Sequence, residues 1–333
     1  MIKKLTTFIT DNTEPYQNLA VEEYLMFHTE ASECILYLWQ NRHTVVIGKN
    51  QNAWKECNVT KLEADGGYLT RRLSGGGAVF HDLGNLNFTF CVKEEDYSVE
   101  KQTQVILEAV RLLGIQAERT GRNDITVDGR KFSGNAFYKS KGYCYHHGTI
   151  LIDVDQNKMS EYLYVSKAKL QSKGVRSVKS RTVNLKELKP DLTVAMMKDA
   201  LEKAFQMVYE TAEEVQKISE ERLNWDEIKK IEERFSSWDW KYGRKIPFDH
   251  SIEQRFVWGG IEIQFHVSGG IIRDLQIFTD AMEVDLANKL ETCWRGCEYK
   301  FGEILQKLED TAFQSENEKQ IKEDLKKLLS EQF

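Results

Sequence analysis

The residues best suited to chemistry lie in a glycine-rich segment near residue 75. Its sequence, RRLSGGGAVFHD over residues 71–82, places two arginines, a serine and a histidine around three consecutive glycines. Glycine allows close backbone approach to a ligand, and free amides beside a guanidinium can bind phosphate or carboxylate. Glycines alone would more often mark a plain connection, and the Walker A ending is missing. The flanking side chains favour a site for an anionic ligand.

A second candidate cluster is GRNDITVDGRKFSGN, residues 121–135. Asp128-Gly129 is the two-residue pattern of a hairpin turn, which would place Asp124 and Lys131 on opposite arms. A strand lysine is most often a solvated surface residue. Beside these neighbours, however, Lys131 can supply positive charge to a phosphate or carboxyl oxygen.

The remaining candidate groups give weaker signals. His146 and His147 are adjacent, so on a strand they face opposite ways and cannot readily chelate one metal. Six cysteines are scattered without CxxC spacing, which predicts reduced thiols. Residues 167–181 hold six basic and no acidic side chains, a composition that fits a solvated connector and a lid over phosphate equally well.

The elements that must position these residues are helices and strands without regular alternation. Helical patterns cover 12–29, 100–113 and 194–209, and strand patterns cover 35–39, 44–47, 86–92, 125–127, 130–132 and 144–152. A turn at 41–43 suggests that the first two strands form a hairpin. The mixture predicts an α+β fold with an antiparallel or mixed sheet.

A charged stretch from about residue 213 to 245, followed by a proline, indicates a domain boundary. We expect a catalytic domain over residues 1–245 and a small α+β C-terminal domain over residues 246–333. The second domain should begin with three strands broken by Gly-Gly pairs and end in amphipathic helices.

The overall composition limits the classes of partner. The formal net charge is -6, without the basic footprint of proteins that bind nucleic acid or anionic membranes. No segment approaches the ~20 apolar residues of a membrane span, and the first residues lack an apolar run typical of a signal peptide. We therefore expect a cytoplasmic protein without nucleic-acid or membrane partners.

Taken together, four motifs resemble those of the two-domain bacterial lipoate-protein ligases. They are RRLSGGGAVFHDLGNLNFTF, GRNDITVDGRKFSGNAF, HHGTILIDVD and KGVRSVKSRTVNL, in that order. Similarity continues upstream through NLAVEEYL and downstream through RFVWGGIEIQF, so it covers nearly the whole chain. The resemblance implies a catalytic domain of the biotin-protein ligase and class II synthetase type, with a mixed sheet.

The resemblance also implies the reaction. Such enzymes activate lipoate with ATP and Mg²⁺ to lipoyl-AMP, and then attach the lipoyl group to a lysine of a carrier protein. The implied acceptors are lipoyl domains of 2-oxoacid dehydrogenase complexes and the glycine-cleavage H protein. Octanoate stays open as an alternative substrate, as do the preferred acceptor and any need for a partner in transfer.

The matched motifs further imply roles for individual residues. Lys131 would be the catalytic residue, which contacts the carboxyl and α-phosphate groups, and Asp124 would hold magnesium. The implied nucleotide-binding residues are Arg72, Gly77, Ala78, Val79, Phe80, Asn123, Asp124, Lys131, Lys173 and Val175. The implied lipoate-binding residues are Leu19, Trp39, Arg71, Ser74, Gly75, His81 and His147.

Three rival functions stay open at this point. An octanoyl or lipoyl transferase of the same fold would need no ATP and would form a thioester, for which Cys144 is the only cysteine beside these motifs. A biotin-protein ligase would carry a different phosphate loop. A non-enzymatic lipoate-binding module would have no need to retain the lysine, both arginines and the glycine loop. The arginine pair, the basic segment and the C-terminal domain favour the ligase.

Overall fold

The computed structural model describes residues 2–332 except 122, 165–180, 211–214 and 244. Its centre is an eight-stranded sheet with the strand order β11-β1-β2-β6-β10-β9-β8-β7. These strands are β1 (Lys4–Ile9), β2 (Glu33–Trp39), β6 (Asn85–Lys93), β7 (Glu118–Thr120), β8 (Asp124–Val127), β9 (Arg130–Ser140), β10 (Tyr143–Leu151) and β11 (Gln216–Lys217). Strand β1 runs parallel to both of its neighbours, while the other pairs are antiparallel. The predicted α+β class with a mixed sheet is confirmed.

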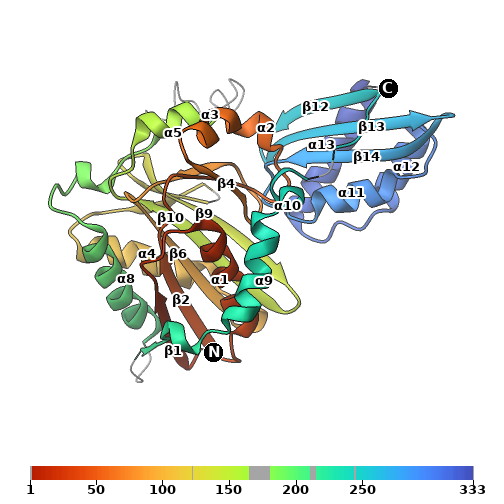
Figure 1. Cartoon of the computed structure of the whole chain (residues 1–333). Coiled ribbons are helices and arrows are strands. Elements are labelled where there is room, and N and C mark those ends of the chain that lie inside the picture. Colours follow the sequence, from red (N-terminus) through yellow and green to blue (C-terminus); the bar gives the residue numbers. More distant parts are fainter. Residues whose placement is uncertain (1, 122, 165–180, 211–214, 244, 333) are drawn as a thin grey trace.

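Helices cover both faces of this sheet because its strands alternate their apolar side chains between two cores. Leu36 and Leu38 of β2 belong to the core that contains side chains of α4 and α8. Tyr37 and Trp39 of the same strand belong to the core that contains side chains of α1 and α9. The helices are α1 (Pro15–His28), α4 (Val99–Leu112), α8 (Val194–Tyr209) and α9 (Trp225–Ser236), and Figure 1 shows α4 with α8 and α1 with α9 as neighbours.

Local capping explains where two of these helices begin. The side chain of Ser98 accepts a hydrogen bond from the amide of Lys101 at the start of α4. Thr193 does the same for the amide of Met196 at the start of α8. Each bond satisfies an amide that has no partner within its helix.

A smaller sheet of β3 (Thr44–Ile47), β4 (Tyr68–Arg71) and β5 (Val79–His81) carries the glycine-rich segment. Strand β3 pairs with β4 in parallel and with β5 in antiparallel orientation, and residues 72–78 connect β4 to β5. The predicted hairpin between residues 35–39 and 44–47 is therefore wrong. Strand β2 pairs with β1 and β6 instead, so the turn at 41–43 leads from one sheet into another.

The predicted hairpin around Asp128-Gly129 is confirmed. Both residues have positive φ, 51° and 74°, and Val127 pairs with Arg130 across the turn. Positive φ at both central positions is what a tight two-residue hairpin turn requires. A register shift between Ile125 and Thr126 follows, and Asp124 pairs with Gly134 further along.

The C-terminal part forms a sheet of β12 (His250–Phe256), β13 (Gly259–Ser268) and β14 (Ile271–Thr279) with three helices against it (Figure 1). The helices are α11 (Leu286–Trp294), α12 (Phe301–Asp310) and α13 (Glu316–Gln332). Its core is drawn from residues 252–329, with Phe265 and Trp294 among the largest buried side chains. This separate core supports our proposal of a boundary near residue 245.

The shorter helices are α2 (Ala53–Glu56), α3 (Val59–Ala64), α5 (Gln156–Tyr162) and α10 (Trp238–Tyr242). Helices α3 and α10 contact β4, and α5 contacts α3 and β5. Among the described residues, no helix combines the length and apolar character that crossing a membrane would require.

Candidate active site

A cavity of about 780 Å³ opens between the large sheet, the glycine-rich segment and the C-terminal part. Strands β9 and β10 contribute Lys131, Gly134 and His147, and the glycine-rich segment contributes Gly76 to Val79. Arg255 and Asp280 line it from the C-terminal part. Residues from both predicted domains therefore line the cavity.

Lys131 lies in this cavity as part of a chain of charges. Its Nζ atom is 2.6 Å from Oδ1 of Asp124, and Oδ2 of Asp124 pairs with Nη2 of Arg181. A Cβ atom built on Gly134 would lie 2.5 Å from the same Nζ, so the lysine side chain occupies the space that a larger residue would fill. The hairpin turn and one glycine thus place a positive charge in the cavity.

Arg72 holds the glycine-rich segment in place through hydrogen bonds. Its guanidinium donates to the carbonyls of Gly75 at 2.7 Å and Gly77 at 2.8 Å, and to Oγ of Ser74 at 3.0 Å. Burial lowers the pKa of Arg72 to about 10, which still leaves it charged near neutral pH. The side chain is buried yet lines the cavity, so it shapes the loop around any bound anion.

Arg71 points elsewhere. Its guanidinium donates to carbonyls of residues 48, 49 and 51 and to those of Trp240 and Lys241 at α10. None of its atoms lines the cavity. Arg71 therefore holds α10 and the segment after β3 together, and the structure does not bring it to the predicted lipoate site.

The glycine-rich segment also contacts the C-terminal part. The amide of Gly76 donates to the carbonyl of Ala281 at 3.1 Å. A Cβ atom on Gly75 would lie 2.4 Å from the carbonyl oxygen of Ala281 and 2.9 Å from that of Met282. Only glycine permits this close approach of two backbones.

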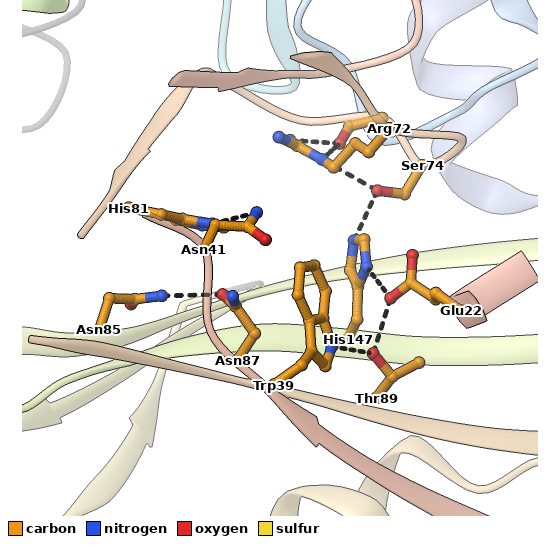
Figure 2. Close-up of polar contacts among 11 residues, drawn as sticks. Glu22, Trp39, Asn41, Arg72, Ser74, His81, Asn85, Asn87, Thr89 and His147 are labelled. Carbon is orange, nitrogen blue, oxygen red and sulfur yellow. Dashed lines mark hydrogen bonds and ion pairs between the residues drawn. The ribbon is translucent and has the colours of Figure 1, made fainter. Parts of the chain in front are cut away.

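A buried hydrogen-bond network, shown in Figure 2, connects Trp39 and His147, two residues of the cavity lining. Oε1 of Glu22 accepts from Oγ1 of Thr89 at 2.6 Å and lies 2.8 Å from Nδ1 of His147. Nε2 of His147 is 2.8 Å from Oγ of Ser74. Because a carboxylate only accepts, the imidazole donates from Nδ1 to Glu22. Trp39 joins the network by donating to Thr89 at 3.1 Å.

His81 and Asn87 line the same region of the cavity. Nδ1 of His81 lies 3.3 Å from Nδ2 of Asn41, and among the described residues no hydrogen-bond partner contacts its Nε2 atom or Nδ2 of Asn87 (Figure 2). Burial, reinforced by the charge of Arg72, lowers the pKa of His81 to about 3. This histidine is therefore neutral and can offer a polar atom to a ligand.

The structure brings together most of the predicted site residues, and eleven of them line the cavity: Leu19, Trp39, Arg72, Gly77, Ala78, Val79, His81, Asn123, Asp124, Lys131 and His147. Arg71, Ser74, Gly75 and Phe80 lie outside the lining, although Ser74 and Gly75 hydrogen-bond with Arg72. The predictions for Lys173 and Val175 fall outside the described residues.

Sequence reasoning missed Glu22, Thr89 and Arg255, and it counted Arg181 only as one of the six basic residues of segment 167–181. Glu22 carried one usable signal, because an acid three residues after Leu19 lies on the apolar side of α1 and must find a buried partner. Thr89 and Arg255 carry no such local signal, since residues distant in sequence, Trp39 and Asp280, are their partners.

The described residues do not form a metal site. No group of three or more His, Cys, Asp or Glu side chains among them could hold an ion. Both oxygens of Asp124 already face the cations of Lys131 and Arg181. A magnesium ligand role for Asp124 would require this ion pairing to break, so the arrangement does not fit a resident metal.

Cys144 is placed where a nucleophile cannot act. It is fully buried on β10 opposite Val92 and does not line the cavity. Burial raises the pKa of its thiol to about 11, which keeps it protonated near neutral pH. A thioester intermediate on Cys144 is therefore disfavoured.

Comparisons with known proteins point to one family of enzymes. The model of the lipoyl protein ligase A/B catalytic domain matches residues 14–206, and that of the bacterial lipoate protein ligase C-terminus matches residues 245–329. A lipoate-protein ligase A of Bdellovibrio bacteriovorus is 40% identical over 304 residues, which are 90% of each chain.

Solved structures give the same picture. LipL1 of P. falciparum in complex with lipoate has a TM-score of 0.85 and 31% identity, and the match covers 97% of this chain and 99% of that one. The bipartite lipoate protein ligase of Thermoplasma acidophilum has a TM-score of 0.64 at 24% identity, over 73% and 98% of the chains. A lipoate-protein ligase A bound with ATP gives 0.62 at 24%, over 73% and 99%. The last two likenesses concern the fold.

Proposed function

This chain belongs to the lipoate-protein ligases, and from that premise we propose that it activates lipoate with ATP and transfers the lipoyl group to a lysine of an acceptor protein. The observation that carries the proposal is the cavity itself. Lys131 and Arg72 line the cavity and supply positive charge. Leu19 and Trp39 also line it and offer apolar surface for a lipoyl chain.

In the first step, a carboxylate oxygen of lipoate attacks the α-phosphorus of ATP. A bond forms between these two atoms, the bond from the α-phosphorus to the bridging oxygen breaks, and pyrophosphate leaves. Negative charge builds on the α-phosphate oxygens, where the fixed charge of Lys131 stabilises it. Arg72 keeps the glycine-rich segment in the shape that receives the nucleotide.

In the second step, the neutral ε-amine of the acceptor lysine attacks the carbonyl carbon of lipoyl-AMP. An amide bond forms, the bond from that carbon to the phosphate oxygen breaks, and AMP leaves with the amine proton passing to solvent. Lys131 again stabilises the developing charge. The described side chains do not form a site for a resident magnesium ion. We propose that Mg²⁺ enters bound to the phosphates of ATP.

We propose lipoyl domains as the acceptors, including the glycine-cleavage H protein, and lipoate or octanoate as the acid. The Thermoplasma ligase was solved in a study together with its E2 lipoyl domain, which supports this class of acceptor. We also propose that the protein acts in the cytoplasm. Its six cysteines are all free thiols, as is usual in a reducing compartment.

The test is pyrophosphate release with ATP, Mg²⁺ and lipoate, each omitted in turn, followed by mass measurement of an added lipoyl domain. Release that depends on all three, with a domain heavier by one lipoyl group, would support the ligase. Acyl exchange between carriers without pyrophosphate release would instead indicate a transferase. Lipoate binding without either reaction would indicate a binding module.

A further inference from the structure

The ion pairs around Asp124 suggest a role for a residue that the predicted site did not include. We propose that Arg181 binds the phosphate of ATP and of the adenylate together with Lys131, and that Asp124 is a positioning residue that holds both cations until phosphate replaces it. This inference rests on the proposed function and adds a second cation to the same site.

The three side chains form one connected group in the cavity wall. Asp124 bridges the two cations, with Oδ1 2.6 Å from Nζ of Lys131 and Oδ2 against Nη2 of Arg181. All three line the cavity, and their side chains are only 16 to 25% exposed. Because they are largely removed from solvent, their mutual attraction is screened less than that of a surface pair.

Backbone pairing brings Arg181 to this place independently of the ion pair. Thr182 forms a parallel bridge with Lys131, and the amide of Val183 donates to the carbonyl of Lys131 at 2.9 Å. On the other side of Lys131, strand β8 carries Asp124 as its first residue. The main chain thus sets the spacing of the two cations, and a change in either side chain need not move the strands.

The charges of this group do not balance. Among the described residues, two cations face one carboxylate here, so these three side chains together carry one net positive charge. The other acids of the lining have partners of their own, because Asp280 pairs with Arg255 at 3.3 Å and Asp324 accepts from Trp258 at 3.0 Å. Within the described lining, an anion that enters the cavity near Lys131 therefore meets two cations, with Asp124 as the acid that competes for them.

Phosphate is the ligand chemistry that fits this arrangement. It offers several charged oxygens, so one group can replace both oxygens of Asp124 at once. The guanidinium of Arg181 presents a planar fork that matches phosphate, while Lys131 acts as a point charge. Since both oxygens of Asp124 are engaged by cations, the same geometry explains why this acid does not fit a metal ligand.

The role of Arg181 is tested with the full chain and the variants R181Q and R181K. Lipoate-dependent pyrophosphate release is measured over a range of ATP concentrations, and lipoate binding is measured by calorimetry without ATP. R181Q should lower kcat/KM for ATP about 10- to 100-fold, the effect of one charge-assisted hydrogen bond. R181K should recover part of the loss, and lipoate binding should not change.

Arg130 provides the matched control. It lies on the same strand as Lys131, pairs with Glu187 at 3.1 Å, has a side chain that is 41% exposed, and does not line the cavity. R130Q should change kcat/KM by less than about two-fold, as for an ordinary surface pair. If R181Q behaved like R130Q, the proposed role of Arg181 would be wrong. Failure of the unmodified protein to release pyrophosphate would instead contradict the proposed function.

The role of Asp124 is tested with D124N through the dependence of the reaction on Mg²⁺. A positioning residue predicts about a ten-fold lower kcat at saturating ATP, with an unchanged Mg²⁺ midpoint. A metal ligand predicts a higher Mg²⁺ midpoint, and that result, or a wild-type kcat, would overturn the role. Should D124N fail to fold, D124E keeps the carboxylate, and the same Mg²⁺ titration decides.

Discussion

Lys131 combines a fixed position with a charge that the proposed reaction needs in both steps. We expect Lys131→Ala to reduce pyrophosphate release at least about 100-fold, comparable to the loss of one oxyanion-stabilising group. The fold should be retained, because the lysine tip lies in the cavity and not in a core. Lys139→Ala is the control, since Lys139 is an exposed lysine of the same strand that pairs with Glu94. Equal activity in both variants would contradict the proposed role.

Gly134 matters because its missing side chain leaves room for Lys131. In Gly134→Ala, the new Cβ atom would lie 2.5 Å from Nζ and 2.7 Å from Cε of that lysine. A flexible tip can move aside, so we expect an intact fold, seen by circular dichroism, with at least about a ten-fold lower rate of pyrophosphate release. An unchanged rate would show that the position of Nζ is not critical.

Two contacts of the site differ in how well the sequence predicted them. Asp124 and Lys131 were predicted to lie on the two arms of one hairpin, because a local rule, the Asp-Gly turn, fixes the hairpin that carries them. The contact of His147 with Glu22 was not predictable in the same way. It joins β10 to α1 across 125 positions, and only the packing of helix on sheet determines it.

The connection between β4 and β5 couples the two parts of the molecule. In Gly75→Ala, the added Cβ atom would meet the backbone oxygens of Ala281 and Met282 at 2.4 and 2.9 Å. Backbone cannot yield as a side-chain tip does, so we expect the C-terminal part to separate from the glycine-rich segment. Faster amide hydrogen exchange at Gly76, which donates to Ala281, would report the separation.

Gly302→Ala is the matched control for this substitution. Gly302 lies in α12, and a Cβ atom there would have no neighbour within 4 Å. Alanine favours the helix by about 1 kcal/mol, so this variant should be as stable as the original or slightly more stable. Equal exchange at Gly76 in both variants would show that the Gly75 contact does not hold the parts together.

Local sequence patterns predicted where strands form but not which strands pair with one another. The apolar runs at 35–39 and 44–47 predicted two strands, and both are present as β2 and β3. Their pairing was wrong, because a short turn suggests a hairpin only when no better partners exist. Here β6 pairs with β2, and β4 and β5 pair with β3. Partners distant in sequence decided the arrangement.

At the scale of the whole molecule, stability should depend on pH through two buried histidines. Burial lowers the pKa of both His81 and His146 to about 3. In the unfolded chain a histidine takes up a proton near pH 6.5. Between pH 6.5 and 3 the unfolded state therefore binds more protons than the folded state, and the free energy of unfolding must fall as the pH is lowered through this window.

Each histidine should contribute of order 1 kcal/mol per pH unit below pH 6.5. Urea unfolding followed by circular dichroism at pH 7 and pH 5 measures the sum. His146→Gln tests the assignment, because His146 lies among Phe88, Phe90 and Phe137, away from the cavity lining. This variant should lose stability less steeply on acidification, whereas substitution of the exposed His250 by Gln should leave the slope unchanged. An identical slope in all three proteins would mean that carboxylates, and not buried imidazoles, govern the acid sensitivity of the fold.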